Sequence, residues 1–182
     1  MALSLNKPFF ILAVILAVFI PSALYPATLA WREVLTPINK ISTIICRDVP
    51  DHTLNLEEFK GTAFWKESHE LAVVRGQMVT DTTKGSGSQL GYFSYYFADK
   101  SSLQVKYQGT ITPGNPTIYN GKLTVTKGTG RYISITGKGG YTGKKSRLGL
   151  EALPTPSITL PDTKDDREDL YYRDIKVEVS LP

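Results

Sequence analysis

The chain of 182 residues has few of the side chains that carry common catalytic or metal chemistry, with one cysteine and two histidines. Cys46 cannot form an internal disulfide without a second cysteine, and we expect it to be a buried, inert thiol. His52 and His69 stand in the polar contexts "PDHT" and "ESHE", with no Cys, His or Asp partner at the spacing of a persuasive metal site. The sequence therefore predicts no metal ion and no cofactor.

Motifs for phosphate binding and for nucleophilic catalysis are also missing. In the stretch "TVTKGTGRYISITGKGGYTGKK", residues 124–145, six residues separate Gly130 from Gly137-Lys138, where a P-loop has four. The Gly128-Thr129-Gly130 sequence lacks the third glycine of a dinucleotide fingerprint. No nucleophile elbow marks a Ser/His/Asp triad. These absences exclude the common nucleotide-binding and hydrolase motifs.

The glycines of this stretch are therefore expected to serve the backbone. Gly128 and Gly130 suit a turn that needs positive φ, where a side chain is disfavoured. Gly137, Gly139 and Gly140 suit a strand with bulges, or the tight bending of a small barrel.

Residues 1–30 differ in kind from the rest of the chain. One cation, Lys7, precedes an apolar run over residues 9–20, and small residues lead to Ala30. This layout is typical of an export signal, and it predicts cleavage after Ala30 and a periplasmic or secreted protein. An uncleaved membrane anchor is the alternative, because residues 9–30 are uncharged and nearly long enough to span a bilayer. Two prolines within that length argue against a smooth helix, so cleaved export is favoured.

Charge is unevenly distributed along the chain, although the net charge is only +4. Residues 122–147 contain no acid, whereas residues 162–178 contain seven. This split predicts either that the two regions lie near one another or that each is a solvated face, and we favour the second interpretation. A basic strip with tyrosines is also typical of single-strand nucleic-acid binders. The modest net charge and the export signal argue against nucleic acid as a partner.

From residue 59 onward, short alternating segments separated by turn signals predict β-strands. Leu103, Val105 and Tyr107 share one parity, with polar residues between them, as in a sheet with one dry face. Seven or eight such strands need a sandwich or a closed barrel to lose their edges. We expect an all-β domain, a closed antiparallel barrel of about eight strands. The expected segments are a signal peptide at 1–30, an irregular lead-in at 31–58, and a barrel at 59–182 with a long Pro-rich, acidic loop at 146–169.

Two stretches, "GYFSYYFADKSSLQVKYQGTIT" and "GKLTVTKGTGRYISITGKGGY", carry a family pattern. An aromatic strand ends in Phe97-Ala98-Asp99, the next strand ends at Gly109, a "GTGRY" turn follows at 128–132, and Gly137-Lys138-Gly139 opens another strand. The pattern resembles the core of the allene oxide cyclase barrel superfamily, which includes plant dirigent proteins, and similar stretches occur in bacterial exported proteins. The resemblance covers about residues 59–143. It implies an eight-stranded antiparallel barrel with an apolar cavity, often assembled as a trimer.

This resemblance does not bring a catalytic set with it. Allene oxide cyclases use a carboxylate and an ordered water, and dirigent proteins use acidic residues around a bound phenolic. Neither set lies within the matching motifs. Glu57, Glu58 and Glu67 are available carboxylates, but no motif supports any of them. No catalytic residue is therefore assigned from the sequence.

Three classes of function stay open. The first, which we favour slightly, is an exported barrel that binds an apolar small molecule. The second is a cyclase or isomerase of the family type, with one buried acid of raised pKa. The third is a structural barrel filled by its own side chains, as small barrels often are. A membrane is expected as a partner only through an uncleaved N-terminus, and the resemblance implies a homotrimer.

Aromatic side chains are the candidates for lining a ligand cavity. Strand parity sends Phe93, Tyr95 and Phe97 to one face and Tyr92 and Tyr96 to the other, and one of these sets faces the interior of a closed barrel. The cavity candidates are Trp65, Tyr92, Tyr95, Tyr96, Tyr107 and Tyr132.

Overall fold

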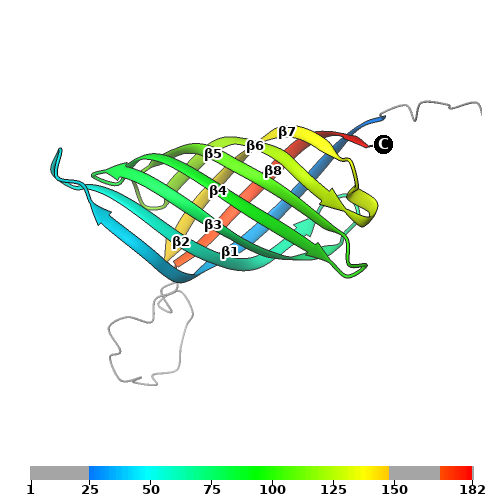
Figure 1. Ribbon diagram of the computed structural model, residues 1–182, viewed down its shortest axis with the longest axis horizontal. Coiled ribbons are helices and arrows are strands. Elements are labelled where there is room, and N and C mark those ends of the chain that lie inside the picture. Colours follow the sequence, from blue (N-terminus) through cyan, green and yellow to red (C-terminus); the bar gives the residue numbers. More distant parts are fainter. Residues whose placement is uncertain (1–24, 148–168, 182) are drawn as a thin grey trace, which may run out of the picture.

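Eight antiparallel strands form a closed barrel in which each strand pairs with the next and β8 pairs with β1 (Figure 1). The structure, a computed structural model, describes residues 25–147 and 169–181. The all-β closed barrel expected from the sequence is confirmed. Within the described ranges, no helix is long and apolar enough to cross a membrane. The elements are β1 Tyr25–Ile45, β2 His52–Trp65, β3 Leu71–Thr83, β4 Ser86–Phe97, β5 Ser102–Thr112, β6 Thr117–Thr129, the 3₁₀ helix η1 Gly130–Tyr132, β7 Thr136–Arg147 and β8 Asp169–Leu181.

Alternation along each strand produces a dry interior and a polar outer surface. In β5 the side chains of Leu103, Val105 and Tyr107 are buried, as their shared parity predicts. In β4, Tyr95 is buried while its neighbour Tyr96 points outward. The interior is strongly aromatic, and its rings contact one another at centroid distances between 4.6 and 6.0 Å. Burial of these large side chains is the main source of stability for the barrel.

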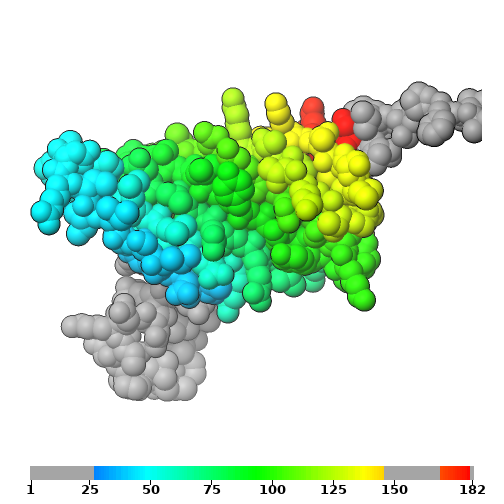
Figure 2. All heavy atoms as spheres, viewed as in Figure 1, coloured from blue at the N-terminus to red at the C-terminus, as the bar shows by residue number. Residues whose placement is uncertain are grey.

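The two ends of the barrel differ. One end holds the turns that follow β2, β4 and β6, and η1 lies there (Figure 1). The other end holds the β1–β2, β3–β4 and β5–β6 turns, and the β1–β2 hairpin projects from it (Figures 1 and 2). We call this projection, residues 36–58, the rim hairpin. Its first strand pairs only with β2, because the pairing of β1 with β8 ends at Leu35.

The segment 31–58, expected to be an irregular lead-in, is instead regular strand over most of its length. It contributes most of β1 and the first half of β2. Pro37 had indicated irregularity, but it lies at a register shift between Pro37 and Asn39, where the ladder tolerates a residue without an N–H group. Strand β1 begins at Tyr25, so the barrel starts well before residue 59. The N-terminal residues 1–24 and most of the expected loop, 148–168, lie outside the described residues.

Glycines in the barrel serve two different purposes. Gly130 has a φ of 59°, as expected for the turn that opens η1, whereas Gly128 is not among the described residues with positive φ. Strand β7 pairs with both neighbours without a register shift, so its glycines do not form bulges. They allow close approach: a Cβ on Gly139 would lie 2.0 Å from the carbonyl oxygen of Lys176 on β8.

Part of the basic region lies beside the described part of the acidic region, residues 169–178. Strands β7 and β8 are neighbours in the sheet, and Lys145 Nζ lies 2.7 Å from Asp169 Oδ2. The pairing therefore supports the first of the two interpretations of the charge split, that the regions are close together.

Candidate functional site

Four polar side chains from four strands meet inside the barrel, and we call them the polar centre: Glu33, Tyr95, Tyr107 and Arg173. Each occupies the inward parity of its strand, so closure of the sheet directs it into the interior. Glu33 on β1 and Arg173 on β8 are directly opposite each other in the strand register. Their exposed fractions are 0% for Glu33 and 4% for Arg173, so a full ion pair is withdrawn from water.

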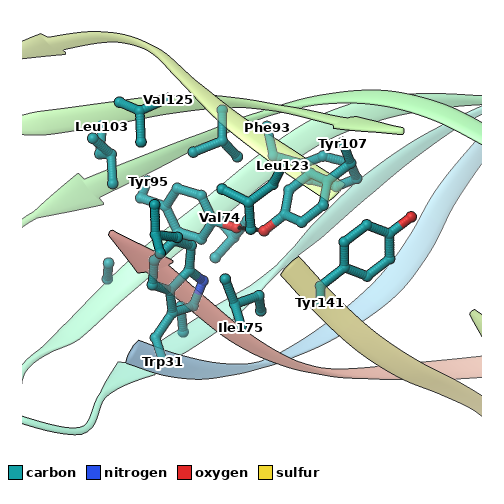
Figure 3. Packing of buried hydrophobic residues seen from close by; sticks show 14 of the residues in the cluster. Trp31, Val74, Phe93, Tyr95, Leu103, Tyr107, Leu123, Val125, Tyr141 and Ile175 are labelled. Carbon is teal, nitrogen blue, oxygen red and sulfur yellow. Dashed lines mark hydrogen bonds between the residues drawn. The ribbon is translucent and has the colours of Figure 1, made fainter. Parts of the chain in front are cut away.

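The polar centre is connected by short contacts. Arg173 Nε lies 2.5 Å from Glu33 Oε1. The hydroxyl of Tyr95 donates to Glu33 Oε2 at 2.6 Å. The hydroxyl oxygens of Tyr95 and Tyr107 lie 2.5 Å apart, and the two rings point toward each other inside the barrel (Figure 3). The Arg173 guanidinium also stacks near two rings, with 4.3 Å to the centroid of Phe93 and 4.2 Å to that of Tyr107. The charge of Arg173 is thus held by a carboxylate and by two aromatic rings.

Burial controls the protonation of this group. Desolvation raises the pKa of Tyr95 and of Tyr107 well above the usual phenol value, and the Glu33 carboxylate raises both further. For Arg173, burial lowers the pKa, but the Glu33 charge and the nearby phenols outweigh it and raise the pKa overall. At neutral pH the two phenols are protonated donors beside a charged guanidinium.

Some buried N–H groups near the polar centre have no hydrogen-bond partner among the described residues: Trp31 Nε1, Trp65 Nε1 and Arg173 Nη2. The two indoles stack on each other with centroids 4.6 Å apart, and each contacts Tyr95 edge-on at 5.3 Å. Buried donors without partners are rare in folded proteins. Both tryptophan rings contact Tyr95, which itself hydrogen-bonds to Glu33, so these donors lie in the same part of the interior as the ion pair.

Further polar side chains lead from the polar centre toward the end that carries the rim hairpin. Gln89 Nε2 donates to the hydroxyl of Tyr141 at 2.6 Å. Tyr119 and Tyr171 pack against each other with centroids 5.5 Å apart, and burial raises the pKa of both phenols. At the opposite end, Tyr132 of η1 packs on Phe97. The interior near the rim hairpin therefore contains the buried amide of Gln89 together with the phenols of Tyr119, Tyr141 and Tyr171.

The aromatic residues proposed from the sequence divide between the two faces of the sheet. Trp65, Tyr95, Tyr107 and Tyr132 are buried inside the barrel. Tyr92 and Tyr96 are exposed on the outer surface, where they cannot line the interior. The cause is their parity, since each alternates with the buried Phe93, Tyr95 and Phe97.

Sequence reasoning missed the two charged members of the polar centre. Glu33 lies within the stretch predicted to be irregular, where no strand alternation is expected. It shares the parity of Trp31 and Leu35, which are both buried. Arg173 likewise shares the parity of Ile175. A charged residue on the apolar parity of a strand is the signal that could have found both. The carboxylates Glu57, Glu58 and Glu67 make no hydrogen bond to the polar centre in the described structure, and Glu67 accepts one from the backbone N–H of Ala30.

Grooves formed by the described residues also occur on the outer surface. One, of about 720 Å³, lies over β6, β7 and β8 and is lined by outward residues such as Lys138, Thr142 and Lys176. Another, of about 810 Å³, lies over β3 to β6 and includes Lys106 and Lys122. Neither groove includes a residue of the polar centre.

Solved structures with a similar fold include two dirigent proteins. The pterocarpan synthase dirigent protein GePTS1 is 11% identical, with a TM-score of 0.45 over 85% of this chain and 84% of that chain. The pterocarpan synthase dirigent protein PsPTS1 is 12% identical, with a TM-score of 0.43 over 84% of this chain and 94% of that chain. No family model matches the sequence, and no curated protein matches it.

The sequence resemblance implied a closed antiparallel barrel of eight strands, and the strand pairing of this chain confirms that architecture. A fold does not define an activity, so activity has to be argued from the residues of this chain.

Proposed function

We propose that the protein is an exported barrel that binds a ring-bearing small molecule with a polar oxygen at the polar centre. The observation that carries this proposal is the buried Glu33–Arg173 pair, which packs against aromatic rings in an interior that also contains N–H donors without partners. The rings offer stacking surfaces, and the donors offer hydrogen bonds that fix orientation. A few placed polar groups in an apolar lining are typical of small-molecule sites.

Stability alone does not account for this arrangement. Replacing a buried ion pair with hydrophobic residues of similar volume is often neutral, or stabilising by about 1–4 kcal/mol. Each buried donor left without a partner costs about 1–3 kcal/mol. A ligand oxygen that accepts from the Trp31 or Trp65 indole, or from Arg173, would recover part of that cost. Local violations of good packing chemistry are expected at functional sites.

An eight-stranded barrel has room for its own side chains or for one small ligand. The rings of Trp31, Trp65 and Tyr95 pack directly on one another, so a ligand that enters between them must displace at least one of these rings. The end near the rim hairpin, where Gln89 and Tyr141 lie, is the better route inward, because a ligand with polar oxygens can exchange hydrogen bonds along it.

Tryptophan fluorescence tests the proposal directly, because both tryptophans of the chain, Trp31 and Trp65, lie inside the barrel. Phenolics, terpenoids and fatty acids would be titrated against the purified protein. We expect quenching by a ring-bearing oxygenated compound at micromolar concentration or below, which corresponds to roughly −8 kcal/mol. Trp65→Phe keeps a ring but removes one free donor, and should weaken binding about 2- to 10-fold. Tyr92→Phe, on the outer surface, is the matched control and should bind as the parent does.

A negative titration would contradict ligand binding. With no quenching, no thermal shift and no co-purified compound, the filled structural barrel becomes the better interpretation.

A cyclase or isomerase activity is the second candidate, favoured by the hydrogen bond from Tyr95 to Glu33. A carboxylate and a phenol in contact, shielded from water, can accept a proton from one atom of a bound molecule and return it to another. Glu33→Gln tests this step. If the protein is an enzyme, this variant should retain ligand binding and lose conversion of the bound compound, as followed by mass spectrometry. Equal conversion by both proteins would remove Glu33 from any mechanism.

Pairing of the first residues of β1 with β8 restricts where an export signal could be cleaved. Cleavage after Ala30 would remove Tyr25–Ala30, which pair with the last residues of β8. Ala27 and Leu29 also pack against the core. We therefore expect N-terminal sequencing of the exported protein to find a start before Tyr25. A start at Trp31 would show that β8 does not need this partner, and an intact Met1 on a membrane-bound form would support the anchor.

A further inference from the structure

The turn at the tip of the rim hairpin brings together three residues with different metal-ligand atoms. Cys46 lies just after β1, His52 begins β2, and Asp48 lies in the turn between them. One ligand atom from each of the three lies within 4.8 Å of the others. The turn is closed by a backbone hydrogen bond from Cys46 N–H to the His52 carbonyl at 2.9 Å. The cluster is therefore held by the ends of two paired strands.

His52 is oriented from both sides of its ring. Its Nδ1 lies 2.7 Å from Asp48 Oδ1, within the cluster. Its Nε2 lies 2.8 Å from Asp81 Oδ1, on the neighbouring strand β3. A carboxylate on the second ring nitrogen is the usual companion of a metal-bound histidine, because it fixes both the tautomer and the direction of the ring. Asp81 lies on β3, outside the turn that carries Cys46, Asp48 and His52, so its contact orients the histidine independently of that turn.

We propose that Cys46, Asp48 and His52 bind one divalent cation of the zinc type, with Asp81 as the positioning residue for His52. Thiolate sulfur, imidazole nitrogen and carboxylate oxygen are the donors that Zn²⁺ takes in proteins. At zinc-ligand distances of about 2.0–2.3 Å, tetrahedral donors stand roughly 3.5 Å apart. The cluster meets this spacing with side-chain adjustments of about an ångström, and a hard cation such as Mg²⁺ would not select a thiolate.

Three protein ligands leave a fourth position for water. Asp48 is exposed, and Cys46 is half-buried rather than buried as the sequence predicted, because it lies in the turn of the rim hairpin. A cation therefore reaches the site from solvent without opening the barrel. The site is therefore independent of the polar centre. Its failure would leave the proposed ligand binding inside the barrel untouched.

Metal titration of the whole chain tests the proposal with Zn²⁺ and with Co²⁺ as a spectroscopic substitute. We expect one equivalent of Zn²⁺ to bind by calorimetry. Co²⁺ should give a thiolate-to-metal charge-transfer band, which only coordination by Cys46 can produce, because the chain has no other cysteine. Zn²⁺ should also protect Cys46 from alkylation in the unmutated protein.

Variants separate the roles of the residues. Cys46→Ala should abolish the cobalt band and weaken Zn²⁺ binding at least 100-fold. Asp81→Asn should keep the band and weaken binding about 10- to 100-fold, as expected for a residue that acts through the histidine ligand. His69→Gln, the other histidine of the chain, is the matched control and should change neither. Circular dichroism checks that each variant keeps the barrel.

Three results would overturn the proposal: no stoichiometric Zn²⁺ binding, no cobalt charge-transfer band, or equal alkylation of Cys46 with and without Zn²⁺. In those cases His52 is an ion-pair partner of Asp48 and Asp81 alone. Because the alkylation measurement uses the unmutated chain, the proposal can be rejected even if a variant fails to fold.

Discussion

Strand β1 runs through both the closed barrel and the rim hairpin, yet its side chains lie in opposite environments in these two regions. Along β1, Leu35 is 1% exposed, whereas Ile41 is 47% exposed. The difference arises where β8 stops pairing with β1, at Leu35. Beyond that point the sheet no longer closes, so alternation no longer produces a buried face. Closure, rather than hydrophobicity alone, decides which apolar residues of this strand become core.

The two regions also hold their polar groups in different ways. In the interior, Glu33 and Arg173 are fixed by packing from several strands and are removed from water. At the rim, His52 is held by hydrogen bonds to two carboxylates that remain largely in solvent. Substitution of a charged group should therefore lower the free energy of unfolding strongly in the interior and weakly at the rim hairpin or on the outer surface.

The largest expected effect is the loss of the interior ion pair. Glu33→Ala leaves Arg173 charged and unpaired in an apolar setting, which should lower the free energy of unfolding by about 3–5 kcal/mol. Asp174→Asn, which removes the exposed partner of Arg32 and Lys66 on the outer surface, is the control and should lower it far less, because solvent screens this pair. Urea unfolding of both variants measures the contrast. Equal midpoints would mean that the polar centre is not buried as described.

A pair of substitutions within β1 sharpens the comparison without changing charge. Leu35→Ala should cost about 2–5 kcal/mol, because it leaves a cavity in the closed part of the barrel. Ile41→Ala, in the rim hairpin, should stay within about 0.5 kcal/mol, as expected for an exposed position. Thermal unfolding of both variants would decide the matter. A large loss for Ile41→Ala would show that its face is covered in the assembled protein.

Substitution of the glycine that opens η1, before β7, should lower stability by a smaller amount. Gly130 has a φ of 59°, and a β-branched side chain is strongly disfavoured there. Gly130→Val should lower stability by about 1–3 kcal/mol. Gly140→Ala is the control, since its added Cβ would meet no atom closer than 3.5 Å. An unchanged melting temperature for Gly130→Val would refute the turn geometry at η1.

The smallest expected effect is the loss of stability when the buried tyrosines ionise. It is absent at neutral pH and increases only at alkaline pH. The pKa values of Tyr95 and Tyr107 are raised by burial, so the folded state keeps phenolic protons that the unfolded state releases. Stability from these groups is therefore complete below about pH 10 and is lost as the pH rises further. Ultraviolet titration, followed together with circular dichroism, should show that Tyr95 and Tyr107 ionise only when the barrel unfolds. Ionisation of every tyrosine near the usual phenol pKa in a still-folded protein would contradict the burial of this pair.

Much of the fold follows from local pattern. Alternation along β4 and β5 is a property of consecutive residues, so the shared face of Leu103, Val105 and Tyr107 could be predicted without a structure. For β4 the alternation separated Tyr95 from Tyr92 and Tyr96, but only closure of the barrel decided which of the two faces is buried. The positive φ of Gly130 could be predicted for the same reason, because a tight turn restricts its own backbone. Prolines misled the interpretation of residues 31–58, since nothing local distinguishes a bulge in a paired strand from an irregular segment.

By itself, the sequence determined an all-β chain with a two-residue period, because the pleat of a strand acts over neighbouring residues. Only the tertiary structure decided which side chains meet. Glu33 faces Arg173 because the first and last strands close the barrel, and His52 reaches Asp81 because β2 pairs with β3 in one register. Both contacts join residues far apart in the chain, and no local sequence pattern specifies the register in which the strands pair.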